Sequence, residues 1–209
     1  MGSYAKIRPM QVPPIHTKTK SHVSARLCLR RWLWAAGLAV VLAGAGGYAV
    51  AAWQSTHVNN FAVVIPGELC RSAQPSAEQF QALLHDYKIG TVISFRTEEE
   101  NTLDPRAGAE ASFLRSRGIA FRQLPTSTPP SAQQFHAFLD AMHDPALPRP
   151  ILVHCAAGRV RTGACVALWR ILHQGWPVEQ ALEDARRFGL KDDPTIAAVR
   201  QFQAEQRNF

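Results

Sequence analysis

Ten consecutive residues, 154–163, decide the fold, and they read His-Cys-Ala-Ala-Gly-Arg-Val-Arg-Thr-Gly. The apolar residues just before them, 150–153, predict a buried strand, and residues 164–173 after them have a helix-forming composition. The stretch is therefore expected to form a tight loop between a strand and the start of a helix. Backbone N–H groups and the helix dipole converge in such a loop, so it suits an anion. The same field lowers the pKa of a cysteine placed there.

Each residue type in the loop has an expected task. Cys155 is the predicted nucleophile, and the planar guanidinium of Arg161 can bind two oxygens of a phosphate and stabilise its transition state. Gly158 lacks a Cβ where the backbone needs positive φ or close approach to a ligand. Thr162 can donate a hydrogen bond to the sulfur of Cys155, which helps that sulfur leave phosphorus when water cleaves the thiophosphate. His154 is expected to position the loop. The remaining predicted substrate-binding positions are Ala156, Ala157, Arg159 and Val160.

The distribution of charge along the chain limits the function classes. Residues 1–53 hold seven of the 23 Lys and Arg residues and no acidic residue, whereas residues 54–209 hold 16 basic and 16 acidic ones. The high pI therefore belongs to the leader, and nucleic acid is not an expected partner. The alternative interpretation of the loop, a buried cysteine beside an unrelated turn, does not explain Arg161 at its spacing from Cys155.

The leader contains a long apolar stretch. Residues 32–53 carry no charge, and a helix of that length spans roughly 33 Å, enough for a bilayer core. Arginines precede it, so a single transmembrane helix is predicted, with a cytoplasmic N-terminus and the rest of the chain outside the cytoplasm, in a bacterium the periplasm. A cleaved signal ending near Ala49-Val50-Ala51 and a buried core helix are the alternatives. Residues 1–31 are predicted to be a disordered basic segment.

The remainder, residues 54–209, is predicted to be one α/β domain. Short apolar runs alternate with amphipathic stretches that begin at helix-capping residues or prolines. The expected strands besides the one before the loop are 61–65, 91–95 and 119–124. The expected helices are 76–87, 104–117, 131–143, 160–174, 177–188 and a last one from 194.

Together with the segments Leu-Cys-Arg-Ser-Ala-Gln-Pro at 69–75 and Thr-Val-Ile-Ser-Phe-Arg at 91–96, the loop resembles the cysteine-dependent protein tyrosine and dual-specificity phosphatases. The likeness is to their bacterial and fungal branch. It implies a mainly parallel sheet of four to five strands flanked by helices, with the active site at the carboxyl ends of the strands. It also implies hydrolysis of a phosphomonoester through a phosphocysteine, with no metal or organic cofactor. In this interpretation Arg71 and Arg96 line the mouth of the pocket. The alternative is that both are solvated surface residues with no role in the site.

One part of the family pattern is missing. In the family, the loop before the strand that leads into the catalytic cysteine usually supplies an aspartic acid as general acid, and here residues 125–130 contain no carboxylate. Asp104 is the predicted substitute, with Glu98, Glu99 and Glu100 as further candidates.

Three functions stay open: a membrane-anchored phosphatase of phosphoproteins or small phosphate esters, a phosphatase of inositol phosphates or lipid head groups, and a non-catalytic phosphate-binding module. The charge of Arg159 favours the second. The missing general acid favours the third.

Overall fold

The computed structural model describes residue 34, residues 38–47 and residues 57–207. The chain divides into two compact units, Met1–Ala49 and Val50–Phe209. In the first, residues 38–47 are helical. The predicted disordered segment 1–31 lies outside the described residues, and so does much of the predicted membrane span 32–53.

The localisation prediction is contradicted. Within the described ranges, no helix is both long enough and apolar enough to cross a membrane. The helical residues described in this unit, 38–47, extend about 15 Å, whereas a bilayer core is about 30 Å thick. The uncharged stretch 32–53 and the arginines before it predicted a span, and the described part of that stretch contains no helix of the required length.

The second unit is built on a five-stranded sheet with the order β1-β2-β5-β3-β4. β1 pairs with β2 antiparallel, and the other pairs are parallel. This mixed, mainly parallel sheet confirms the predicted α/β class. The strands are β1 Ala62–Ile65, β2 Leu69–Ser72, β3 Thr91–Ser94, β4 Ala120–Gln123 and β5 Ile151–His154.

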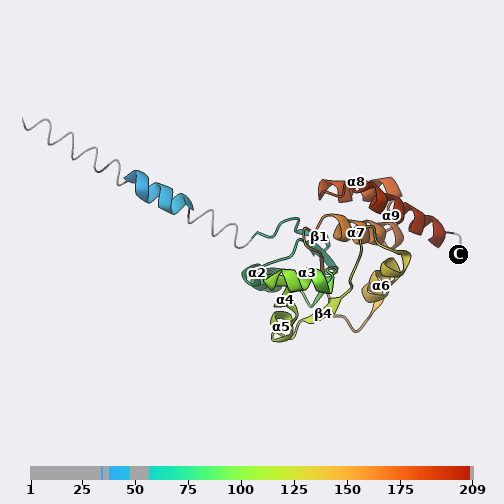
Figure 1. Ribbon diagram of the computed structural model, residues 1–209, viewed down its shortest axis with the longest axis horizontal. Coiled ribbons are helices and arrows are strands. Elements are labelled where there is room, and N and C mark those ends of the chain that lie inside the picture. The colour runs from blue at the N-terminus through green and yellow to red at the C-terminus, as the bar shows by residue number, and fades with distance from the viewer. Residues whose placement is uncertain (1–33, 35–37, 48–56, 208–209) are drawn as a thin grey trace, which may run out of the picture. The chain divides into compact units, whose positions relative to one another are not determined.

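Helices cover both faces of this sheet, which is why the whole of β5 is buried. Alternate residues of β5 enter different cores: Ile151 and Val153 pack in the larger one, and Leu152 in the smaller one. The larger core is formed with α6 Ala132–His143, α7 Val160–Leu172, α8 Val178–Arg187 and α9 Asp193–Gln206. The smaller core is formed with α2 Ala77–Tyr87 and α5 Glu110–Arg115. Figure 1 shows α7, α8 and α9 together in orange and red, away from the green α2–α5.

Three local features differ from the sequence predictions. The expected helix 104–117 is divided into α4 Pro105–Gly108 and α5. Strand β2 was not expected, because its buried Arg71 and Ser72 make it look polar. Helix α3 Glu98–Leu103 was not expected either, because its run of three glutamates resembles a solvated loop. A capping box between Thr97 and Glu100 begins α3.

Candidate active site

The predicted loop lies where the sequence places it. β5 ends at His154, Cys155 follows, and α7 begins at Val160. Cys155 is only 3% exposed. Because the neighbouring parallel strands β2 and β3 end at the same edge of the sheet, their following segments, 73–75 and 95–97, lie beside the loop.

Gly158 is required by the packing of this loop. Its φ is +66°, and a Cβ there would lie 2.4 Å from the carbonyl oxygen of Ser72. The sequence predicted positive φ or close approach to a ligand; the positive φ is present, and the close neighbour is the protein's own backbone at the end of β2. Any larger residue would push the loop away from that strand.

Arg161, in the first turn of α7, is held by a carboxylate and two carbonyls. Its Nη1 and Nη2 donate to the two oxygens of Glu100 at 2.7 and 2.6 Å. Nη1 also donates to the carbonyls of Phe95 (2.9 Å) and Thr126 (3.4 Å). The hydrogen bonds from Arg161 hold the pKa of Glu100 at about 2. The pKa of Arg161 is raised, by Glu100 first and also by the Cys155 sulfur nearby.

Arg96 and Asp104 form a second layer behind Glu100. Nη1 of Arg96 lies 3.1 Å from Oδ2 of Asp104, and its Nη2 donates to the Glu100 carbonyl at 2.8 Å. Arg96 is 5% exposed and Arg71 is 1% exposed, so neither is a solvated surface residue. The predicted site residue Asp104 is thus linked to Arg161 through Arg96 and Glu100.

His154 has a partner that the sequence analysis missed. Its Nε2 lies 2.7 Å from Oε1 of Glu110 in α5, and the two side chains are 0% and 1% exposed. Neither atom has another hydrogen-bond partner among the described residues. The signal was present in the sequence, because Glu110 lies four residues before the apolar Leu114 and so shares its helical face, and Leu114 is buried.

The remaining predicted positions differ in exposure. Ala156, Ala157 and Arg159 are exposed, and Val160 is half-buried. Oγ1 of Thr162 is buried and has no hydrogen-bond partner among the described residues, so the expected bond to the Cys155 sulfur is not formed here. Its task in releasing the thiolate stays a prediction.

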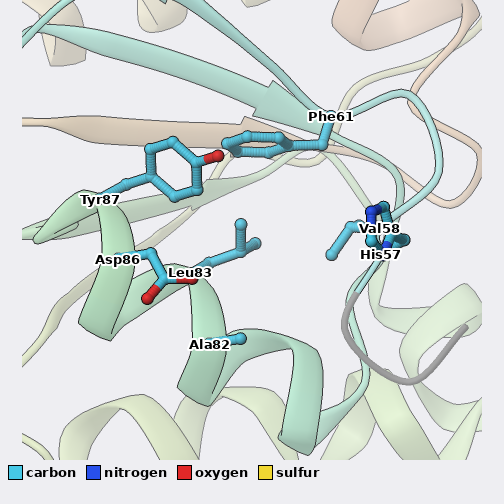
Figure 2. A pocket seen from close by; sticks show the side chains of 7 residues that line it. All are labelled: His57, Val58, Phe61, Ala82, Leu83, Asp86 and Tyr87. Atoms are coloured by element: carbon cyan, nitrogen blue, oxygen red, sulfur yellow. The ribbon is translucent and has the colours of Figure 1, made fainter. Parts of the chain in front are cut away.

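Two cavities lie away from this loop. Figure 2 shows one of about 330 Å³ between the segment that leads into β1 and helix α2, where the rings of Phe61 and Tyr87 lie 4.6 Å apart. Another, of about 340 Å³, is lined by Glu110 together with Phe80 and Phe113. Neither cavity is lined by Cys155 or Arg161.

Comparison with known proteins agrees with this geometry. A family model described as a DSP-PTPase phosphatase fused to NAD⁺ kinase matches residues 49–204. The chain belongs to the cysteine-dependent tyrosine and dual-specificity phosphatase superfamily. This membership confirms the resemblance drawn from the loop.

Two curated relatives of this phosphatase-family chain are informative. The dual specificity protein phosphatase TpbA of Pseudomonas aeruginosa strain UCBPP-PA14 is 30% identical over 60% of this chain and 53% of that protein. The inositol diphosphatase SIW14 of Saccharomyces cerevisiae is 32% identical over 63% of this chain and 46% of that protein. The chain thus spans about half the length of the curated relatives it matches.

Solved structures of the same two proteins share the fold. The SIW14 catalytic core from S. cerevisiae superposes with a TM-score of 0.61 at 26% identity, covering 72% of this chain and 90% of that one. P. aeruginosa TpbA superposes with a TM-score of 0.56 at 30% identity, covering 72% and 92%.

Proposed function

We propose that the chain hydrolyses phosphomonoesters through a phosphocysteine intermediate on Cys155. The Cys155 thiolate attacks phosphorus, the phosphorus–oxygen ester bond breaks, and the leaving alkoxide takes a proton. Water then attacks phosphorus, the sulfur–phosphorus bond breaks, and inorganic phosphate and the thiolate are released. No metal or organic cofactor takes part in these steps.

The observation that carries this proposal is the geometry of Arg161. A guanidinium has five N–H donors, and Glu100 with the two carbonyls uses Nη1 and one hydrogen of Nη2. These acceptors do not use Nε and the second Nη2 hydrogen, which together form a side-on pair on the guanidinium that suits two phosphate oxygens. Because Glu100 fixes the rest of the group, Arg161 meets the developing charge without first being ordered.

The burial of the other thiols supports Cys155 as the nucleophile. Burial raises the pKa of Cys70 to about 11 and raises that of Cys165 still further. Both thiols therefore stay protonated at neutral pH. Among the cysteines of the described residues, Cys155 is the one at the start of a phosphate loop.

For the leaving-group proton, we retain Asp104 as the proposed donor. Glu100 does not suit this task, because a carboxyl whose pKa is about 2 is ionised at neutral pH. Glu98 and Glu99 are exposed on α3. Asp104 is partly buried, its carboxylate lies 3.1 Å from the Arg96 guanidinium in the layer behind Glu100, and its role as the donor is tested separately below.

Two substrate classes remain, and different observations favour each of them. The match to TpbA, a dual specificity protein phosphatase, favours a phosphoprotein substrate. The match to SIW14, an inositol diphosphatase, together with the exposed Arg159 in the loop, favours an inositol phosphate. A non-catalytic phosphate-binding module has no need of a thiol at position 155.

The test uses the purified chain with a phosphotyrosine peptide, a phosphoserine peptide, inositol hexakisphosphate and an inositol pyrophosphate. Phosphate release that is lost in Cys155→Ser and kept in Cys165→Ala is the expected result, since an alcohol is a poor nucleophile here. The substrate with the highest kcat/KM decides the class. Activity that survives in Cys155→Ser would refute the thiolate mechanism.

A further inference from the structure

Three consecutive peptide groups of the phosphate loop form hydrogen bonds with residues 60–74, the segment that contains β1 and β2. The carbonyl oxygens of residues 156–158 each accept one hydrogen bond from that segment. The backbone N–H of Gln74 donates to the first at 3.1 Å, Nδ2 of Asn60 to the second at 2.8 Å, and Nη2 of Arg71 to the third at 2.6 Å. The donors belong to three different residues of the segment, so each of the three loop peptides is held separately.

The consequence for the loop follows from peptide geometry. The loop peptides are trans, since the cis bonds of the described residues lie at Pro129 and Pro150. In a trans peptide the C=O and the following N–H point in opposite directions. With the carbonyls of residues 156–158 turned toward β1–β2, the N–H groups of residues 157–159 point to the other side. None of these N–H groups donates to a protein acceptor in the described part of the chain.

We propose that Asn60 and Arg71 are positioning residues, which fix two of these peptide planes so that the next two N–H groups present themselves to the phosphoryl group. The inference deepens the proposed function and rests on it. Neither side chain touches the substrate. Each acts through one loop carbonyl.

Asn60 is built for this contact. It adopts the left-handed conformation with φ of +54°, which asparagine and glycine tolerate better than other residues. Its turn is held independently of its side chain, because Phe61 N donates to the Val58 carbonyl at 3.2 Å and Ala73 N donates to the Asn59 carbonyl at 2.8 Å. Removing the amide therefore leaves the backbone in place.

Arg71 acts from below the loop. Its guanidinium carbon lies 4.0 Å from the centroid of the Phe188 ring, and two of its nitrogens, Nε and Nη1, have no partner among the described residues. Burial lowers the pKa of Arg71 to about 10, so it keeps its charge at neutral pH, helped by Asp184 and Cys155. The same side chain thus orients a peptide and places a positive charge near the thiolate.

The decisive variant is Asn60→Gly, because glycine keeps the backbone conformation and removes only the donor. Its matched control is Lys88→Gly, which makes the same backbone change at an exposed residue of equal φ, +54°, after α2. Three quantities are measured: inhibition by inorganic phosphate, the pH dependence of Cys155 alkylation followed by mass spectrometry, and kcat and KM on an aryl phosphate.

We expect Asn60→Gly to weaken phosphate inhibition about threefold to tenfold, the effect of one hydrogen bond, and to shift Cys155 alkylation to higher pH. The turnover number should fall more than KM rises, while the melting temperature follows the Lys88→Gly control. Asn60→Asp should weaken phosphate inhibition and lower the turnover number more than Asn60→Gly does, because a carboxylate oxygen then faces a carbonyl oxygen. Arg71→Lys tests the contact with the Gly158 carbonyl. We expect the same weakening of phosphate inhibition, because lysine keeps the positive charge but lacks the planar guanidinium.

An Asn60→Gly protein that matches Lys88→Gly in phosphate inhibition and in alkylation would overturn the inference. The outcome is separable from failure of the proposed function. If the wild type releases no phosphate from any ester, the proposed function fails, and phosphate binding measured by calorimetry, together with the alkylation profile, still decides whether Asn60 orients the loop.

Discussion

The ion pair between Glu100 and Arg161 gives a stability prediction with a defined pH range. Glu100→Gln keeps the shape of the side chain and one acceptor oxygen, but it removes the charge. The pKa of Glu100 falls from 4.5 to about 2 in the folded protein, which corresponds to an upper bound of about 3.4 kcal/mol. The Glu100 side chain is 33% exposed, so solvent screening reduces the expected loss to about 1–2 kcal/mol at neutral pH.

The sign of the pH dependence follows from the lowered pKa. The ionised carboxylate is the form that stabilises the folded state, so the contribution is fully present above about pH 4.5. It is lost as the pH falls toward 2, where the folded protein takes up the proton. Glu100→Gln lacks this dependence, so the difference in unfolding free energy between the two proteins should shrink across that range.

Urea unfolding at several pH values measures this difference, with Glu99→Gln as the matched control on the exposed face of α3. The turnover number on an aryl phosphate should fall about tenfold in Glu100→Gln, because Arg161 is then fixed by fewer bonds. The control should change neither quantity. A Glu100→Gln protein as stable as Glu99→Gln at pH 7, or a difference that persists unchanged at pH 2, would refute the reasoning.

Three further predictions concern single residues of the site. Arg161→Lys should lose most of its turnover with little change in substrate affinity, because a point charge cannot bind two oxygens side-on. Steady-state kinetics measure both quantities, and an unchanged kcat would show that Arg161 takes no part in the reaction. Asp104→Asn should slow alkyl phosphates strongly and aryl phosphates with acidic phenols much less if Asp104 supplies the leaving-group proton; equal slowing of both would indicate a structural role. Gly158→Ala should destabilise the protein more than Gly67→Ala does. Both glycines have positive φ, where an alanine costs about 1–2 kcal/mol, but only at position 158 would the Cβ also clash with backbone, 2.4 Å from the Ser72 oxygen. Equal melting temperatures of the two variants would contradict the clash.

The sequence was a good guide wherever the signal was local. Ser76 and Ser131 cap α2 and α6 as expected, because a capping box needs only residues three apart. The strand, loop and helix around Cys155 also follow from neighbours in the chain. The membrane prediction, which rested on the length of the uncharged stretch 32–53 and on the arginines before it, failed, because no helix among the described residues is long and apolar enough to cross a bilayer.

The sequence by itself therefore determined the family, the α/β class and the strand, loop and helix around Cys155, since these depend on spacings of a few residues. Tertiary structure alone decided the partners of that loop. Glu100 meets Arg161, Glu110 meets His154 and Asn60 meets the Ala157 carbonyl because β5 lies between β2 and β3 in the sheet. No local pattern encodes that strand order, so side chains 44 to 97 residues apart become neighbours only when the sheet assembles.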